Sequence, residues 1–389
     1  MRITSIEPVI VHVNHRGDWV FIQVHTDAGL TGLGEASHSG NDALLVQVLS
    51  QYQERLRGED PRRIGAIRAW AARGDLGRVR RTAWSGLEQA LWDLLGQSLG
   101  APIHALMGGA VRERIRLYAN INRHVEARSP EAFAIAAAAA VSEGFTGIKL
   151  APFDEVSGAS RRRTATDAPW RLGIQRVRAV REAIGPGVEL MVDCHGRFDA
   201  GDVRQVAQEL AALDVLWIEE PVPDTQLEAL SHLTGQLPVA TAAAENVYGI
   251  EGFAPFFSSR VVDVLMPDVK HDGGLLETKI ITEAARMAGL LVAPHNPSGP
   301  VSTAATAQVA STLTDLMFLE YAWGEASWRA DLMDPPERIE EGYLLLPQGP
   351  GLGHRLNPLV LGSHRVVEAS NVDSSRVTPM QSASGGMPE

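Results

Sequence analysis

Apolar positions in the first hundred residues change from the spacing of strands to that of helices. Residues 3–13 and 19–24 are rich in β-branched and aromatic side chains, and an Asp-Ala-Gly turn signal leads into a third run at 30–35. In the segments 44–56 and 80–99, apolar residues recur with the helical period. We therefore expect an α+β block in which antiparallel strands precede helices.

From about residue 114 onward, short apolar runs alternate with amphipathic stretches. The apolar runs are 115–121, 147–150, 188–193, 215–219, 239–245, 261–268, 290–295 and 316–320. The helix-like stretches between them include 130–142, 175–183, 202–213, 274–288 and 301–313. Buried strands that alternate with helices predict a parallel sheet, and this number of them predicts a modified (β/α) barrel of the TIM type.

The change of pattern suggests how the chain divides. We expect an α+β block at 1–112, completed by 324–369, and a barrel domain at 113–323. The last stretch, 370–389, is rich in Ser, Gly, Met and Pro and is expected to be disordered. A polar insertion at 154–171 is expected to be a solvated loop, although its place after the second barrel strand would also let it cover a substrate.

Composition narrows the range of partners. Among 389 residues, acids outnumber bases 47 to 35, which gives a formal charge of -12 and disfavours nucleic acid and anionic membrane surfaces. The single cysteine, Cys194, excludes a disulfide within the chain and a thiolate metal site, as is usual in a reducing compartment. The longest apolar stretch, 133–141, is too short to span a bilayer, and no signal peptide is recognised. We expect a cytoplasmic protein.

Three acidic residues stand at regular intervals at the ends of apolar runs. Asp193, Glu219 and Glu245 are separated by 26 and 26 residues, one strand-helix unit each time, so they should stand at one height on neighbouring strands. Carboxylates this close raise each other's pKa, and a divalent cation would relieve the repulsion. With oxygen ligands and no thiolate, Mg²⁺ is the first choice and Mn²⁺ a substitute.

The series continues along the barrel. Asp268, His295 and Glu320 follow at intervals of 23, 27 and 25 residues. On adjacent strands, the Asp268 carboxylate could orient the His295 imidazole and raise its basicity, as a general base requires. His195 follows Asp193 by two residues, and side chains two apart on a strand share a face, so it should point at the same region.

Each of these residues has a simpler interpretation. A single acid at a strand end is usually solvated or a helix cap, and a single histidine is usually structural. Six residues in near-regular register are harder to explain in that way. Other polar residues close in sequence are expected mostly to be solvated or supporting, and we assign them no role: Glu220, Asp214, Asp263, Lys270, His271 and Asp272.

Taken together, these motifs resemble the enolase superfamily and, within it, the mandelate racemase subgroup. The resemblance covers nearly the whole chain, since the α+β block and the returning C-terminal segment match the family's capping domain. The combination of motifs is specific, although each motif alone is weak. The motifs are Val192-Asp193-Cys194-His195-Gly196-Arg197, Trp217-Ile218-Glu219-Glu220-Pro221, Ala244-Glu245-Asn246, Met266-Pro267-Asp268 with Gly273-Gly274, Pro294-His295-Asn296-Pro297, and Leu319-Glu320-Tyr321.

The resemblance implies Mg²⁺-dependent removal of the proton α to a substrate carboxylate, with the metal stabilising an enediolate. By the same resemblance, the metal ligands are Asp193, Glu219 and Glu245. Asp268 and His295 correspond to the catalytic dyad. Glu320 corresponds to the residue that hydrogen-bonds a substrate carboxylate oxygen.

Two departures from the subgroup pattern bear on the reaction. Epimerases of this kind carry a Lys-x-Lys pair on the second strand, whereas this chain has Lys149-Leu150-Ala151 and lacks the second lysine. Lys149 could still neutralise the substrate carboxylate, or it could be structural. His195 stands where acid-sugar dehydratases similar to galactonate dehydratase carry an imidazole acid. The leading hypothesis is therefore dehydration of an aldonate or aldarate to a 2-keto-3-deoxy acid.

Two alternatives remain open. One is a racemase or epimerase of a hydroxy acid or amino-acid derivative, with His295 facing His195 or Lys149. The other is a non-catalytic, metal-binding member of the fold. A metal-dependent hydrolase is disfavoured because the first barrel strand offers no His-x-His pair.

The substrate is expected to be a small anionic acid sugar, but its identity does not follow from the sequence. In the family, specificity comes from capping-domain loops, here residues 14–18 with His15 and Arg16, and the loop near His38. Arg16 is the candidate substrate-binding residue on these loops. The resemblance also favours a homo-oligomer.

Overall fold

The N-terminal part of the chain forms a sheet covered by helices. The computed structural model describes residues 1–15, 17–71, 77–157 and 168–366. An antiparallel sheet of order β1-β2-β3 comprises β1 (Ile3–Asn14), β2 (Gly17–Thr26) and β3 (Thr31–Glu35). The helices that follow are α1 (Asp42–Leu56), α2 (Ile64–Ala71), α3 (Gly77–Leu99) and the short α4 (Ile103–Leu106). The sequence pattern predicted α1 and α3, whereas α2 was not predicted.

The second part is a closed barrel of parallel strands. The strands are β4 (Arg114–Asn120), β5 (Gly147–Leu150), β6 (Glu189–Asp193), β7 (Val215–Glu219), β8 (Ala240–Ala243), β9 (Val264–Leu265), β10 (Leu291–Val292) and β11 (Leu319–Ala322). They pair in chain order from β4 to β10, β11 pairs with β4, and a parallel bridge between Val292 and Leu316 closes the ring. The expected barrel and capping layer are confirmed.

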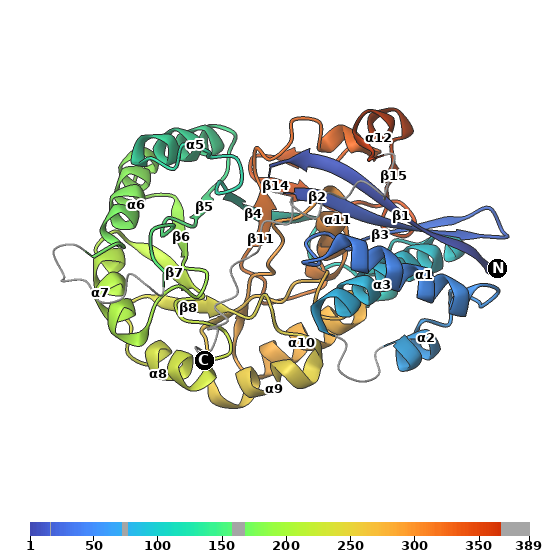
Figure 1. Ribbon diagram of the computed structural model, residues 1–389, viewed down its shortest axis with the longest axis horizontal. Helices are drawn as coiled ribbons and strands as arrows, with labels where there is room; N and C mark the ends of the chain where they lie inside the picture. The colour runs from blue at the N-terminus through green and yellow to red at the C-terminus, as the bar shows by residue number, and fades with distance from the viewer. Residues whose placement is uncertain (16, 72–76, 158–167, 367–389) are drawn as a thin grey trace, which may run out of the picture.

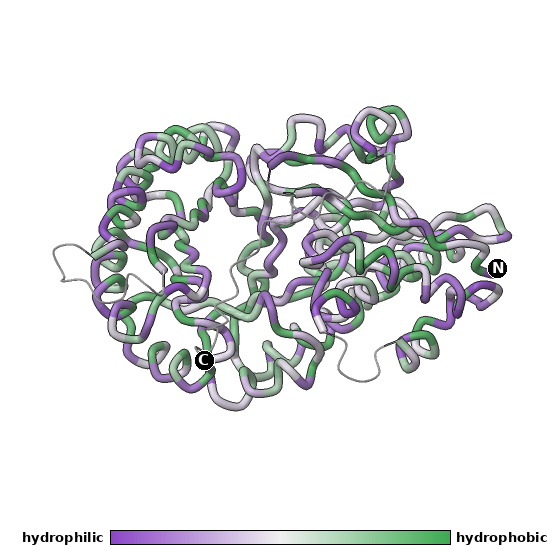
Figure 2. The backbone as a smooth tube through the Cα atoms, in the orientation of Figure 1, coloured by the Kyte–Doolittle hydropathy of each residue, from purple (hydrophilic) through white to green (hydrophobic). Residues whose placement is uncertain are grey.

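Helices surround the barrel and alternate with its strands (Figure 1). They are α5 (Pro130–Ser142), α6 (Arg171–Ile184), α7 (Ala200–Ala211), α8 (Leu227–Thr234), α9 (Gly249–Ser259), α10 (Leu275–Met287) and α11 (Pro300–Ala310). Figure 2 shows hydrophobic positions along the barrel strands and a mixture of hydrophobic and hydrophilic positions along α6 and α7. No helix in the described ranges is long and apolar enough to cross a membrane.

The C-terminal segment connects the two parts. Its elements are the 3₁₀ turn η3 (Ala330–Leu332), β12 (Met333–Asp334), β13 (Ile339–Glu340), β14 (Tyr343–Leu345), β15 (Arg355–Leu356) and α12 (Pro358–His364). β14 pairs antiparallel with barrel strand β4 rather than with the N-terminal sheet. After α12 the chain reaches that sheet, where the Val366 N–H donates to the Ile10 carbonyl at 2.9 Å. The tail expected to be disordered, 370–389, lies outside the described residues.

Large side chains fill the barrel interior beneath the carboxyl ends of the strands. Tyr118 and Trp217 lie edge to face at 5.7 Å, and Tyr118 packs in the same way on Phe318 at 6.0 Å. Gly147 leaves room for them, since a Cβ there would lie 3.0 Å from the Tyr118 Cβ. The packed interior closes the barrel from below. Any reaction site must therefore lie at the mouth, where the Trp217 Nε1–H donates to Glu219 at 3.3 Å.

The N-terminal layer also caps a barrel helix. The buried Glu35 carboxylate accepts hydrogen bonds from the N–H groups of Gly299 at 2.8 Å and Ser302 at 2.7 Å, at the start of α11. A helix N-terminus has unpaired N–H groups and a positive dipole end, so a carboxylate stabilises it. Gly299 is required for this approach because its Cβ would lie 2.8 Å from the carboxylate. This contact anchors the cap beside the barrel mouth.

Candidate active site

The acidic series gathers at the barrel mouth, but its members are held in different ways. Asp193 and Glu219 end β6 and β7 and are paired in register, as their spacing predicted. Glu245, Asp268 and His295 were expected at strand ends, yet they lie in the loops beyond β8, β9 and β10. At the end of β8, the backbone turns at Ala244, which has a φ of 97°. The side chains still reach the mouth from these loops.

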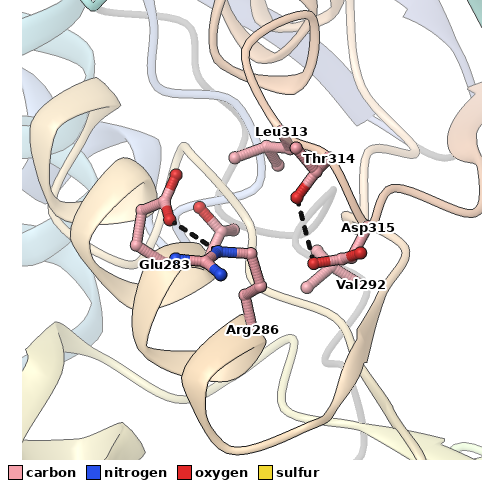
Figure 3. Close-up of a pocket in the computed structure, with 7 residues that line it drawn as sticks. Glu283, Arg286, Val292, Leu313, Thr314 and Asp315 are labelled. Atoms are coloured by element: carbon pink, nitrogen blue, oxygen red, sulfur yellow. Dashed lines mark hydrogen bonds and ion pairs between the residues drawn. The ribbon is translucent and has the colours of Figure 1, made fainter.

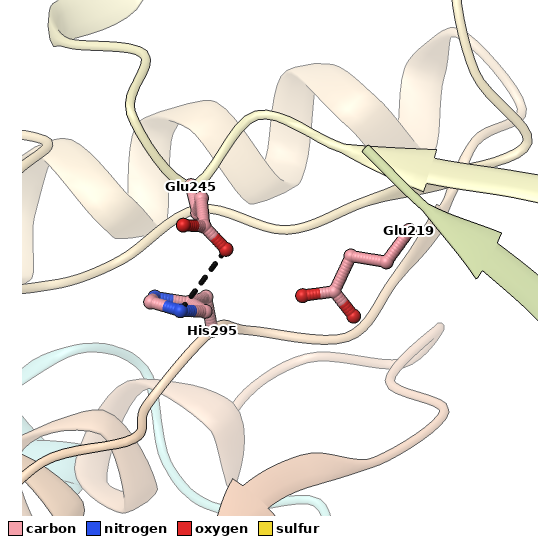
Figure 4. A group of neighbouring side chains, drawn as sticks. All are labelled: Glu219, Glu245 and His295. Carbon is pink, nitrogen blue, oxygen red and sulfur yellow. Dashed lines mark ion pairs between the residues drawn. The ribbon is translucent and has the colours of Figure 1, made fainter. Parts of the chain in front are cut away.

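Three of these side chains form a compact group. One ligand atom from each of Glu219, Glu245 and His295 lies within 4.8 Å of the others (Figure 4). Glu245 Oε2 is buried and lies 3.0 Å from His295 Nε2, but the contact lacks hydrogen-bond alignment and the oxygen has no other partner in the described structure. A buried, unsatisfied carboxylate oxygen is an unfavourable arrangement that a bound cation would relieve. The carboxylates of Glu219 and Glu245 therefore fit a divalent cation.

Asp193, expected to be the third ligand, is engaged elsewhere. Its Oδ2 lies 2.8 Å from His195 Nε2, and its Oδ1 accepts from the His195 N–H at 2.9 Å. Asp193 is not part of the compact group, although it faces Glu219 across the β6–β7 pairing. The carboxylate of Asp193, which the resemblance assigns as a metal ligand, is thus bound to the imidazole and the backbone N–H of His195.

The neighbouring carboxylates contribute to a raised pKa of Glu219. Burial raises this pKa most, Lys149 opposes the rise, and the charges of Asp193, Glu320 and Glu245 bring the value to about 8. Like charges in a buried site disfavour ionisation of one another, as the spacing argument required. A cation at this point would favour the ionised form of all of them.

His295 and Asp268 form a tight pair. His295 Nδ1 donates to Asp268 Oδ2 at 2.8 Å, which leaves Nε2 directed at the compact group. Burial alone would lower the pKa of His295, but Glu245, Glu320 and Asp268 raise it to about 9. The His295 side chain is 13% exposed, so it is sheltered yet reachable. The geometry is that of an oriented imidazole base.

Lys270, to which the sequence assigned no role, also contacts the Asp268 carboxylate. Its ammonium donates to Asp268 Oδ2 at 2.6 Å and its N–H to Oδ1 at 2.8 Å. Burial would raise the pKa of Asp268, but Lys270, His271 and His295 hold it well below its usual range. The carboxylate therefore remains ionised beside the imidazole.

Lys149, the candidate substrate-binding lysine, is buried between two carboxylates of the site. Its ammonium is 2.7 Å from Glu219 Oε1 and 2.9 Å from Glu320 Oε1, and the residue is only 1% exposed. Burial would lower the pKa of Lys149, but Glu219 and Glu320 raise it well above its usual value. The lysine links the two carboxylates and neutralises part of their charge.

Glu320, in β11, acts as an acceptor here. It accepts from Asn120 Nδ2 at 2.7 Å and from the Asn296 N–H at 2.8 Å, besides pairing with Lys149. Burial would raise the pKa of Glu320, but Lys149 and His295 lower it. The expected hydrogen bond to a substrate carboxylate needs a proton on Glu320, so that assignment stays a prediction.

His195 reaches the mouth for a different reason from the one predicted. Strand alternation does not apply, because β6 ends at Asp193 and His195 has a left-handed φ of 50°. Its side chain is 40% exposed and turns back onto the Asp193 carboxylate. Burial would lower the pKa of His195, but Asp193 raises it. A non-glycine residue in this region of φ persists only where the surroundings hold it.

Several residues that the sequence left unassigned are buried at or near the site. Glu220, Lys270, His271 and Asp272 are buried, whereas Asp214 is exposed and Asp263 is half-buried. Burial, followed by the charges of Glu245 and Asp193, raises the pKa of Glu220 well above its usual value. The Glu-Glu-Pro run was the only sequence signal for Glu220.

The loops predicted to determine substrate specificity lie only partly within the described residues. Arg16 lies outside the described residues, as does 158–167 of the polar insertion. Asn14 Nδ2 donates to the Glu325 carbonyl at 3.4 Å, so the β1–β2 hairpin reaches the loop after β11. His15 Nδ1 lies 3.7 Å from Glu126 Oε1, and both side chains are exposed. The hairpin thus touches the rim of the barrel mouth.

A separate hollow lies away from these residues. It is lined by residues that precede β10 and β11, together with Val292, and Figure 3 shows Glu283, Arg286 and Asp315 around it. Its volume of about 10 Å³ leaves room for little more than a single water molecule. It is therefore too small for a substrate.

Comparisons with known proteins agree with this architecture. Residues 4–108 match the family described as mandelate racemase / muconate lactonizing enzyme, N-terminal domain, and residues 132–360 match the enolase C-terminal domain-like family. A D-xylonate dehydratase of Haloferax volcanii is 32% identical over 94% of this chain and 89% of its own. A D-galactonate dehydratase of Ralstonia pickettii is 32% identical over 86% and 88%. The structure of a mandelate racemase/muconate lactonizing enzyme-like protein from Rubrobacter xylanophilus is 34% identical, with a TM-score of 0.86, and covers 94% of this chain and 98% of that one.

Proposed function

Because this chain belongs to the mandelate racemase / muconate lactonizing enzyme family of the enolase superfamily, we propose that it is a Mg²⁺-dependent dehydratase of an acid sugar. Relatives named as dehydratases of xylonate, gluconate and galactonate support this reaction and substrate class. The product would be a 2-keto-3-deoxy acid.

The observation that carries the proposal is the placement of two imidazoles. His195 follows β6 and His295 follows β10, and these strands stand on opposite sides of the ring, with three strands between them either way. Each imidazole is bound to its own aspartate, Asp193 or Asp268. Two separately oriented imidazoles can serve as a base and an acid in one reaction.

We assign the proton transfers as follows. His295 Nε2 removes the proton from C2, the carbon α to the carboxylate. The C3–O bond then breaks, and a proton from His195 leaves with the hydroxyl group as water. The resulting enol takes up a proton at C3, loses the proton of its C2 hydroxyl group and becomes the ketone. Atoms balance as loss of one water molecule.

The carboxylates provide the charge that this chemistry needs. Asp193, Glu219 and Glu245 would hold Mg²⁺, which when bound supplies positive charge to the substrate carboxylate. Lys149 adds positive charge beside Glu320, where that carboxylate would lie. The α-proton beside a carboxylate is very weakly acidic, so charge stabilisation must supply most of the rate enhancement.

An epimerase is the second candidate, since imidazoles on opposite sides of a substrate can also move a proton from one face to the other. Incubation in deuterated buffer separates the two reactions. Deuterium at C2 of recovered acid and of its epimer, without a keto product, would favour the epimerase.

The deciding experiment is a panel of mono- and diacid sugars incubated with Mg²⁺ and assayed for a 2-keto product. We expect turnover of at least one acid sugar, loss of turnover with a chelator, and loss in H295N. H232N, a change at an exposed histidine of α8, is the matched control. If no acid sugar reacts, or if H295N reacts like the parent, the dehydratase assignment is wrong.

A further inference from the structure

The guanidinium of an arginine in the N-terminal layer contacts the loops at the barrel mouth. Arg78, near the start of α3, donates from Nη1 to Asn246 Oδ1 at 2.5 Å and from Nη2 to His271 Nε2 at 3.1 Å. Nη2 also donates to the His38 carbonyl at 3.1 Å. The side chain is half-buried, so these contacts hold the guanidinium at the boundary between the cap and the barrel.

The hydrogen-bond partners of Arg78 are neutral. A guanidinium can only donate, so His271 Nε2 must accept, and the ring carries its proton on Nδ1, which lies 2.9 Å from Thr82 Oγ1. Burial, followed by the charges of Arg78 and Lys270, holds the pKa of His271 well below its usual value. In the described part of the chain, no carboxylate forms an ion pair with Arg78, although its charge opposes the rise that burial causes in the pKa of Asp224.

A second arginine nearby, Arg123, does form an ion pair with a carboxylate. Arg123 Nη2 donates to His38 Nε2 at 2.9 Å, and its Nε donates to Glu325 at 2.5 Å. Burial and then Arg123 hold the pKa of His38 well below its usual value, so this imidazole is neutral too. His38 has a left-handed φ of 62°, a strained conformation for a non-glycine residue. Glu325 forms an ion pair with Arg123, whereas Arg78 forms no ion pair with a carboxylate among the described residues.

The guanidinium of Arg78 lies next to the candidate site. Asn246 directly follows Glu245, and consecutive Cα atoms are about 3.8 Å apart. His271 belongs to the same loop as Asp268 and donates its N–H to the Asp268 carbonyl at 2.8 Å. Arg78 therefore contacts both the loop that carries a candidate metal ligand and the loop that carries half of the dyad. A half-buried cation without an anion is unfavourable, and an anionic group on a ligand would relieve it.

We propose that Arg78, with the neutral imidazoles of His38 and His271 beside it, binds a second anionic group at the end of the substrate remote from the reacting carboxylate. The substrate class is then an aldarate, an acid sugar with a carboxylate at each end, rather than the monoacids for which the relatives are named. This inference rests on the proposed function. A terminal phosphate has the same charge chemistry, so the test includes both sources.

The test compares substrates that share stereochemistry and differ at the far end. The pairs are galactarate with galactonate and glucarate with gluconate, and 6-phosphogluconate represents the phosphate. We expect a higher kcat/KM for the diacid of at least one pair than for its monoacid and for the phosphate. In R78Q, the KM for the diacid should rise about tenfold or more, which corresponds to about 1.4 kcal/mol, with little change for the monoacid.

Two variants of the same helix control for charge and folding. R80Q removes an exposed arginine of α3 and should leave both substrates unaffected. R78K keeps the positive charge and should retain part of the diacid preference. Thermal unfolding of each variant shows whether the fold is intact.

The outcomes separate this inference from the proposed function. A monoacid or the phosphate as the preferred substrate, or an equal loss for diacid and monoacid in R78Q, overturns the aldarate subsite while dehydration stands. If no acid sugar is dehydrated, calorimetric measurement of the affinity for galactarate and for galactonate still tests the aldarate subsite. Tighter binding of the diacid that is lost in R78Q supports the subsite, and equal binding of both acids overturns it.

Discussion

The Glu88 carboxylate of α3 accepts a hydrogen bond from the backbone N–H of Leu275, the first residue of barrel helix α10, at 2.7 Å. The Leu276 N–H donates to the other oxygen at 3.2 Å. Gly274 has a φ of 95°, and a Cβ there would lie 2.3 Å from the carboxylate. Glu88 of the N-terminal layer thus caps the N-terminus of barrel helix α10, which begins just after the loop that carries Asp268.

This contact predicts a pH dependence of stability. Burial raises the pKa of Glu88 to about 7, against the opposing backbone hydrogen bonds, from an ordinary value of 4.5. The native state therefore retains the proton to higher pH than the unfolded chain does, and the free energy of unfolding falls as the pH rises from 4.5 to about 7. The contribution of this one group is about 3 kcal/mol.

Urea unfolding of wild type and E88Q at pH 5 and pH 7.5 measures this effect. Glutamine cannot ionise, so the free energy of unfolding of E88Q should fall less between the two pH values than that of wild type. E228Q, at an exposed first-turn acid of α8, should follow wild type. Equal pH dependence in wild type and E88Q would contradict the buried proton at Glu88.

Cation binding should stabilise the fold through Glu245. Mg²⁺ at 100 times its Kd is expected to raise the free energy of unfolding by about 2.7 kcal/mol, seen as a higher Tm. E245Q should lose this increase, because the buried unpaired oxygen that fits the ion is replaced. E251Q, at an exposed acid of α9, should keep it. A Mg²⁺-dependent Tm that persists in E245Q would place the cation elsewhere.

Removal of the dyad imidazole should abolish proton abstraction. H295N is expected to lower kcat by about 10²–10⁴-fold, the usual contribution of a positioned general base. D268N should also lower kcat, because Asp268 orients Nδ1 at 2.8 Å. Both losses are measured as 2-keto product formed per unit time, with circular dichroism to confirm folding. Activity of H295N within tenfold of wild type would rule out the assignment of His295 as the base.

Loss of the second imidazole should separate the two halves of the reaction. In H195N, dehydration should fall by about 10²–10⁴-fold, because the leaving hydroxyl has lost its proton donor. Exchange of the C2 hydrogen in deuterated buffer should continue, since His295 is untouched on the opposite side of the barrel. Mass spectrometry of the recovered substrate measures the exchange. Normal dehydration in H195N would show that another group protonates the hydroxyl.

The site could be predicted in part because spacing reflects topology. One strand-helix unit returns the chain to the same height, so the interval of 26 residues between Asp193 and Glu219 predicted their pairing in register. The pairing of His295 with Asp268 was also predicted from adjacent strands, and the structure places them 2.8 Å apart. The argument was wrong in detail for Glu245, Asp268 and His295, which lie in loops beyond their strands. It was also wrong for His195, whose backbone is left-handed, so that strand alternation does not apply.

The sequence by itself determined the family, the barrel with its cap, and the acids and imidazoles that would gather at one end of the strands. The family follows from the resemblance of the motifs, and the barrel and its series of acids and imidazoles follow from periodicity and spacing, which are properties of neighbouring residues along the chain. Only the tertiary structure decided which charges meet: Lys149 between Glu219 and Glu320, Lys270 on Asp268, and Arg78 among neutral partners. The energy of a buried charge depends on groups brought close by folding from distant parts of the chain, and no local pattern records their distances.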